Sequence, residues 1–135
     1  MDLAKEERAA DIQKLASSPL EEAIRQFTGV VIEFHRKHPA FRTLYAEAPL
    51  SKDTVEQKRL LVQTFIGIVS RVLSTRNPKL DKRDALWSAE IVLTALIGFL
   101  PALAGRRTSD RARTIDALNQ MLVRYLEPVL KPAQR

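Results

Sequence analysis

The chain has 135 residues, which suits one domain with a sizeable apolar core, and its 45% hydrophobic and 28% charged residues exclude a disordered chain. It has no cysteine, which excludes disulfides, thiolate metal sites and a cysteine nucleophile, and its N-terminus lacks the apolar run of a secretory signal, so we expect a cytoplasmic location. The net charge of +6 is compatible with nucleic acid as a partner, but the basic residues are spread over helix faces and two loops, and we interpret them as solvated surface charge.

Apolar residues recur at helical spacing along nearly the whole chain, and no segment alternates with a period of two, so the sequence predicts an all-α bundle of five to six helices. A first, charged helix is expected over residues 2–16. Ser18, Pro19 and Glu21 then predict the start of a second helix, because serine caps a helix, proline suits its first position and glutamate completes a capping box. The apolar side of that helix continues until Pro39 ends it.

The remainder of the chain is expected to form a short helical piece over residues 40–47 and then three longer helices. A long amphipathic helix runs over about 51–74, and a helix capped by Asp81 follows and becomes apolar on all sides through Leu103. The last helix follows Thr108. The longest apolar stretch is shorter than the roughly 20 residues that a membrane span needs, so we expect no membrane-spanning segment and no membrane partner.

The last two helices carry more apolar surface than one small bundle can cover, since exposed apolar area costs about 25 cal/mol per Å². Small residues near one line of the helix over 82–104 would let another helix approach closely. The sequence therefore predicts a homodimer, with these two helices of each subunit forming a four-helix bundle about a two-fold axis. The alternative is a monomer in which helices 2–16 and 51–75 cover this surface. The expected interface residues are Ala95, Leu96, Gly98, Phe99, Ala102, Leu118, Leu122, Tyr125 and Val129.

Catalytic chemistry has no strong candidate in this sequence. The two histidines, His35 and His38, are spaced so that they could share a helix face and a metal ion, but Arg36 and Lys37 lie between them. A cap at the end of the second helix, where positive charge complements the helix dipole, explains them better. No metal, phosphate-binding or nucleophile motif is present, so we expect a protein that is not an enzyme and needs no cofactor or metal. A third and weaker hypothesis is a small helical enzyme. It would require a catalytic activity that is lost when His35 or Tyr45 is mutated.

A binding pocket for a small molecule has better candidates, because aromatic residues from four segments would meet inside a compact bundle. Such pockets are mostly apolar with a few placed polar groups, although the same residues could form an ordinary hydrophobic core. The candidate ligand-binding residues are Phe27, Val31, Phe34, Phe41, Tyr45, Thr64, Phe65, Ile68, Trp87 and Ile91.

The segment over residues 38–49, HPAFRTLYAEAP, resembles the short helix and loop that follow the first regulatory-domain helix in TetR-type transcriptional regulators. The order that follows is also similar: a long amphipathic helix, a polar loop with Asn-Pro, an alanine- and leucine-rich helix over 83–104, and a final helix containing LVRYL at 122–126. The resemblance covers about residues 19–130. It implies a dimer formed by the last two helices and an effector pocket enclosed by the helices before them.

On this resemblance, residues 1–135 form a single domain, in which 1–17 are the remnant of a connecting helix and 18–135 are the regulatory and dimerisation domain. The helix-turn-helix headpiece of the family is absent, so either a stand-alone domain or a piece of a longer regulator is expected.

The leading hypothesis is an effector-binding, dimeric domain that takes a small, largely apolar molecule between residues 27–45, 61–68 and 87–94 and does not bind DNA specifically by itself. The alternative is a helical protein-interaction module that dimerises without a ligand.

Overall fold

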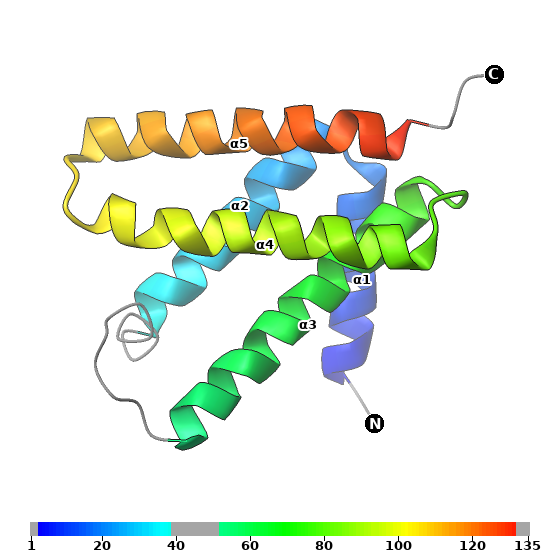
Figure 1. Cartoon of the computed structure of the whole chain (residues 1–135), viewed down its shortest axis with the longest axis horizontal. Helices are drawn as coiled ribbons and strands as arrows, with labels where there is room; N and C mark the ends of the chain where they lie inside the picture. Colours follow the sequence, from blue (N-terminus) through cyan, green and yellow to red (C-terminus); the bar gives the residue numbers. More distant parts are fainter. Residues whose placement is uncertain (1–2, 39–51, 132–135) are drawn as a thin grey trace.

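The computed structural model describes residues 3–38 and 52–131. The described residues form an all-α bundle without strands, which confirms the predicted fold class (Figure 1). The expected short helix over 40–47, with Phe41 and Tyr45, lies outside the described residues. The helices are α1 (Leu3–Ser17), α2 (Leu20–Lys37), α3 (Lys52–Arg76), α4 (Lys82–Ala104) and α5 (Thr108–Leu130).

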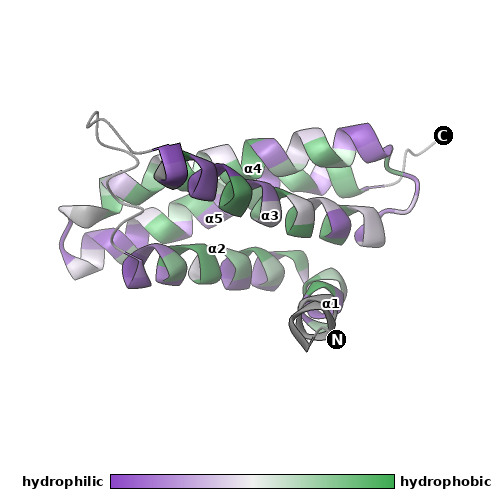
Figure 2. Ribbon diagram, turned by 90° about the horizontal axis from the view of Figure 1, so that it is seen from below, coloured by the Kyte–Doolittle hydropathy of each residue, from purple (hydrophilic) through white to green (hydrophobic). Residues whose placement is uncertain are grey.

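The helices pack in two layers, with α4 and α5 antiparallel and side by side in one of them (Figure 1). Helix α2 crosses behind both, α3 packs along α4, and α1 lies against α2 and α3. Seen from below, α1 and α2 lie on the side of the bundle opposite to α4 (Figure 2). The bundle therefore presents two separate sides, one formed by α4 and α5 and the other by α1, α2 and part of α3.

The helix boundaries follow local chemistry, with one difference from the expectation. The carboxylate of Asp81 caps α4 and accepts a hydrogen bond of 3.1 Å from the backbone N–H of Arg83, as predicted. Pro19, however, occupies the capping position of α2, which has no side-chain cap. The Ser18 hydroxyl instead donates back to the carbonyl oxygen of Lys14 at 2.7 Å. The predicted capping role of Ser18 was therefore wrong, because its hydroxyl bonds to the end of α1.

Helix α4 is the centre of the core. Ala85, Ala89 and Leu96 are wholly buried in it, and the small size of the two alanines allows neighbouring helices to approach closely. The core face of α4 meets buried leucines of α5 and buried residues of α2 and α3. The residues of this core include Ile24, Val31, Val69, Leu73, Val92, Leu93, Leu96, Leu100, Leu103, Leu118, Leu122 and Leu126.

Over Lys82–Leu103, α4 is also long and apolar enough, by length and composition, to cross a membrane. Counting consecutive apolar residues does not indicate such a span, because polar residues in the first turns of α4 interrupt the apolar stretch. A core helix of a bundle passes the same test, and the burial of Ala85, Ala89 and Leu96 between neighbouring helices is the arrangement of such a core helix.

Candidate functional site

Three phenylalanine rings meet between α2 and α3. Phe27 and Phe34 lie two turns apart on α2, and each contacts Phe65 of α3 edge-on, with ring centroids 5.9 and 6.0 Å apart. Edge-to-face contacts of this kind stabilise a cluster beyond the apolar area that it buries. At the end of α2, the His38 ring stacks on Phe34 with centroids 4.1 Å apart. The cluster therefore joins α2 to α3, and Phe34 and Phe65 also line a small space with Leu93 of α4.

These rings form part of a groove between α1, α2 and α3, which we call the aromatic groove. Its volume is about 860 Å³, within the range of about 300–1,000 Å³ that small-molecule sites occupy. Apolar and aromatic side chains make up its floor, and charged side chains stand around its rim. The apolar lining residues are Leu15, Phe27, Val30, Phe34, Phe65 and Ile68, and the charged ones are Asp11, Lys14, Glu33 and Lys37.

The acidic rim residue Glu33 is neutralised by its own helix. Its carboxylate accepts a hydrogen bond from Arg36 at 2.6 Å and lies 3.9 Å from the amine of Lys37. The hydrogen bond from Arg36 lowers the pKa of the Glu33 carboxyl below its ordinary value. Because both side chains are exposed, this ion pair shapes the charge at the rim more than it stabilises the fold.

A smaller cavity adjoins the groove, and we call it the inner cavity. Its volume is about 50 Å³, and Leu15, Phe27 and Ile68 line both spaces. Most of its other walls are core residues of α2, α3, α4 and α5. Thr28 of α2 and Arg76 at the end of α3 also line it, but only through their apolar atoms. The inner cavity therefore lies between the aromatic groove and the centre of the bundle.

Arg76 joins the inner cavity to α1. Its Nη2 donates to the backbone carbonyl oxygen of Leu15 at 2.8 Å and also to that of Ser18. Both carbonyls belong to the end of α1 and the turn after it. Burial lowers the pKa of the Arg76 guanidinium below its ordinary value, because a partly buried cation loses hydration. One side chain thus holds the end of α1 against the end of α3.

The structure brings together five of the ten candidate ligand residues. Phe27, Phe34, Phe65 and Ile68 line the aromatic groove. Val31 is buried one step further in, where it lines a separate space of about 40 Å³ with Phe34 and Phe65.

Among the described residues, three further candidates do not line the groove. The Thr64 side chain is exposed, and its hydroxyl donates to the carbonyl oxygen of Leu60 at 2.9 Å. Trp87 is 65% exposed and Ile91 37% exposed on α4, and neither residue lines the aromatic groove. The structure does not bring Trp87 and Ile91 to this groove, because the apolar residues around the whole of α4 face two different sides. Phe41 and Tyr45 lie outside the described residues.

Sequence reasoning also missed Leu15, Val30, Thr28 and Arg76. Leu15 is on a charged helix with no clear apolar face, so its packing against α2 and α3 could not be read from periodicity. Thr28 offered a signal, since it stands on the buried side of α2 one residue after Phe27.

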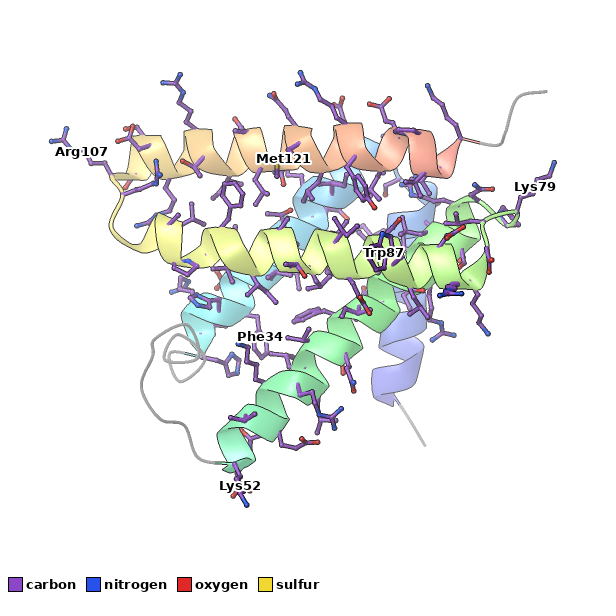
Figure 3. The ribbon with its side chains drawn as sticks, viewed as in Figure 1. Phe34, Lys52, Lys79, Trp87, Arg107 and Met121 are labelled. Atoms are coloured by element: carbon purple, nitrogen blue, oxygen red, sulfur yellow. The ribbon has the colours of Figure 1, made fainter. Side chains whose placement is uncertain are left out.

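A second surface lies on the opposite side, where α4 and α5 run next to each other (Figure 3). Trp87 and Met121 are labelled there, and Met121 is 46% exposed. Exposed residues of α4 recur at spacings of four and three, which marks one helix face pointing away from the core. We call this surface the outward face; it consists of Trp87, Ile91, Thr94, Gly98 and Pro101 of α4 with Ala117 and Met121 of α5.

The outward face differs from the interface expected from sequence. Leu96, Leu118 and Leu122 are at most 3% exposed and pack in the core of their own chain, so they cannot present a free surface to a partner. Ala95, Phe99, Tyr125 and Val129 are partly buried, whereas Gly98 and Ala102 are exposed. The difference has a simple cause: the chain uses the large side chains of Leu96, Leu118 and Leu122 for its own core.

Together, these features define a small all-α domain with an aromatic groove on one side and an apolar outward face on the other. Residues 19–126 match the family described as Tetracyclin repressor-like, C-terminal domain, and the chain belongs to this family. Comparisons with curated proteins and with solved structures gave no match. A domain of this family is the regulatory part of a TetR-type regulator, for which dimerisation and ligand binding are typical.

Proposed function

We propose that this chain is the effector-binding and dimerisation domain of a TetR-like transcriptional regulator, and that a small, largely apolar effector binds in the aromatic groove. The observation that carries the proposal is the groove itself, a space of about 860 Å³ with three clustered phenylalanines in or beside its floor. Such a lining favours an apolar ligand. We further propose that the domain acts in the cytoplasm, is not an enzyme, needs no cofactor and does not bind DNA specifically by itself.

The groove also supports a route from ligand to output. Helix α1 forms one wall of the groove through Leu15, and we interpret residues 1–17 as a connecting helix to a headpiece. A ligand that contacts α1, α2 and α3 together would favour one placement of α1 over another. In a complete regulator, that placement sets the separation of two DNA-binding headpieces and therefore their fit to an operator.

Ligand binding can be tested with a neutral apolar dye, Nile red, and a matched pair of valine substitutions. Val30 lines the groove and is 56% exposed, whereas Val55 on α3 is 50% exposed and is not among the groove residues. Val30→Gln should weaken saturable binding of the dye about tenfold, while Val55→Gln should leave it unchanged. Equal affinity for both variants, or a lack of saturable binding, would contradict the proposed groove.

We propose that dimerisation uses the outward face. Burying Trp87, Ile91 and Met121 would remove an exposed apolar patch from water. A Cβ atom at Gly98 would meet no other atom within 4 Å, so the chain's own packing does not require a glycine there. A glycine inside a helix costs about 1 kcal/mol relative to alanine, and close approach of a partner helix would explain its presence.

Sedimentation at micromolar concentration tests this interface. Gly98→Leu and Trp87→Glu should each convert a dimer into a monomer, and Gly98→Leu should do so without disturbing the subunit, since the space beside it is open. Leu60→Glu is the matched control, because Leu60 is 50% exposed on α3 and should leave the dimer intact. A monomeric unsubstituted chain would rule out the dimer. A dimer without saturable ligand binding would instead favour the interaction module.

A further inference from the structure

Arg76 is the last residue of α3, and it caps the end of α1 from outside that helix. Its Nη2 donates to the backbone carbonyl oxygen of Leu15 at 2.8 Å and also to that of Ser18. The last carbonyls of a helix have no partner within it and carry the negative end of its dipole. A guanidinium supplies both the donor and the opposite charge, so these hydrogen bonds are strong and fix where α1 ends against α3.

Helix α1 lacks the apolar stripe that orients most helices of a bundle. Within residues 10–17, Ile12 is buried and Leu15 is partly buried. These two side chains lie within about one turn of each other, at the same end of α1 that Arg76 holds. From there α1 runs away from α5 (Figure 1). The hydrogen bonds from Arg76 therefore contribute to the direction of α1 as well as to its attachment.

The next residue in the sequence ties a third helix to the same place. Asn77 is 7% exposed, and its Nδ2 donates to the carbonyl oxygen of Val129, in the last turn of α5, at 3.3 Å. Its Oδ1 accepts a hydrogen bond of 3.2 Å from the backbone N–H of Lys79, which holds the turn after α3 in shape. Because Arg76 and Asn77 are adjacent, the ends of α1 and α5 are both bonded to the end of α3.

The part of α1 that Arg76 holds is also a wall of the aromatic groove. Asp11, Lys14 and Leu15 line the groove, and the carbonyl oxygen of Leu15 accepts the hydrogen bond from Arg76. A ligand in the groove therefore contacts the same turn of α1. From Leu15 back to Lys5, α1 is a lever of about 15 Å, so a rotation of about 10° at Arg76 would move Lys5 by about 3 Å.

We propose that Arg76 is a positioning residue for the output of this domain: its hydrogen bonds to α1 form the pivot about which a ligand in the aromatic groove sets the direction of α1. Asn77 fixes this pivot to the end of α5. The N–H groups of a guanidinium are fixed in one plane, so they hold two carbonyls in one geometry. A bound ligand favours the direction of α1 that it contacts best. This inference rests on the proposed function and assigns the residue through which the groove acts on α1.

Double electron–electron resonance between two spin labels measures the direction of α1. The chain has no cysteine, so Lys5→Cys and Gln63→Cys provide two unique labelling sites, one on α1 and one at an exposed position of α3 outside the groove. Labelled chain is diluted with unlabelled chain, so that only distances within one subunit contribute. Without ligand the distance distribution should be narrow, and saturation with Nile red should shift its mean by about 3 Å.

Arg76→Gln in the labelled chain should widen the distribution at least about twofold and abolish the shift on adding Nile red, because both charge-assisted hydrogen bonds are lost. Dye affinity should stay within about threefold, since Arg76 is not a groove residue. Arg71→Gln is the matched control, an exposed arginine earlier on the same helix, and should behave as the unsubstituted chain. Circular dichroism checks the helix content. Arg76→Lys keeps the charge, should widen the distribution less, and decides the matter if Arg76→Gln fails to fold.

Three outcomes would overturn the inference. A distribution as narrow in Arg76→Gln as in the unsubstituted chain would mean that α1 is positioned without Arg76. An equal shift in both chains on adding Nile red would mean that the dye acts on α1 by another route. Saturable dye binding without any shift in the unsubstituted chain would remove the pivot. If the dye does not bind, the proposed ligand site fails, and the width of the distribution still decides whether Arg76 positions α1.

Discussion

Replacing Thr28 by valine should make the ligand-free domain more stable. Valine has nearly the shape of threonine and a similar helix propensity, so the main change is removal of a buried hydroxyl that has no partner. Leaving such a group unpaired costs about 1–3 kcal/mol, and we expect the free energy of unfolding to rise by about 1–2 kcal/mol. For a domain of this size, that corresponds to an increase in Tm of about 3–8 °C.

Urea denaturation followed by circular dichroism measures this change, at one protein concentration because the stability of a dimer depends on it. Thr64→Val is the control and should change the free energy of unfolding by less than about 0.5 kcal/mol, since its hydroxyl is exposed. A less stable Thr28→Val protein would show that the hydroxyl has a partner in the free domain and would refute the reasoning.

Three further changes test the core, a loop and the rim. Leu96→Ala should lower the free energy of unfolding by about 2–5 kcal/mol in urea denaturation, because this fully buried side chain fills the core beneath α4. Asn77→Ala should cost about 1–3 kcal/mol in the same assay, because the Asn77 amide donates to the carbonyl oxygen of Val129 at 3.3 Å and fixes the loop after α3 to the end of α5. Arg36→Gln should raise the pKa of Glu33 toward its ordinary value in an NMR titration, because it removes the hydrogen bond that lowers this pKa most. Because the folded-state pKa of Glu33 is lowered, its ion pair stabilises the fold above the ordinary pKa and that contribution is lost as pH falls through the lowered value.

The sequence by itself determined the secondary structure and the family. Helical spacing of apolar residues, Asp81 before α4 and the absence of period-two alternation predicted the helices that the structure contains. These signals are local, since caps and periodicity depend on residues within a few turns of each other. The meeting of Phe27, Phe34 and Phe65 was also expected, because amphipathic helices in a small bundle turn their aromatic stripes inward.

Only the tertiary structure decided which side of α4 serves which purpose. Periodicity cannot divide a helix that is apolar on all sides, so Trp87 was assigned to the pocket and Leu96 to a partner, whereas the first is exposed and the second is wholly buried. The outcome depends on where α2, α3 and α5 cross α4, which no single helix encodes. The same holds for Thr28 and Arg76, which are far apart in the sequence and line one cavity only because folding brings their helices together.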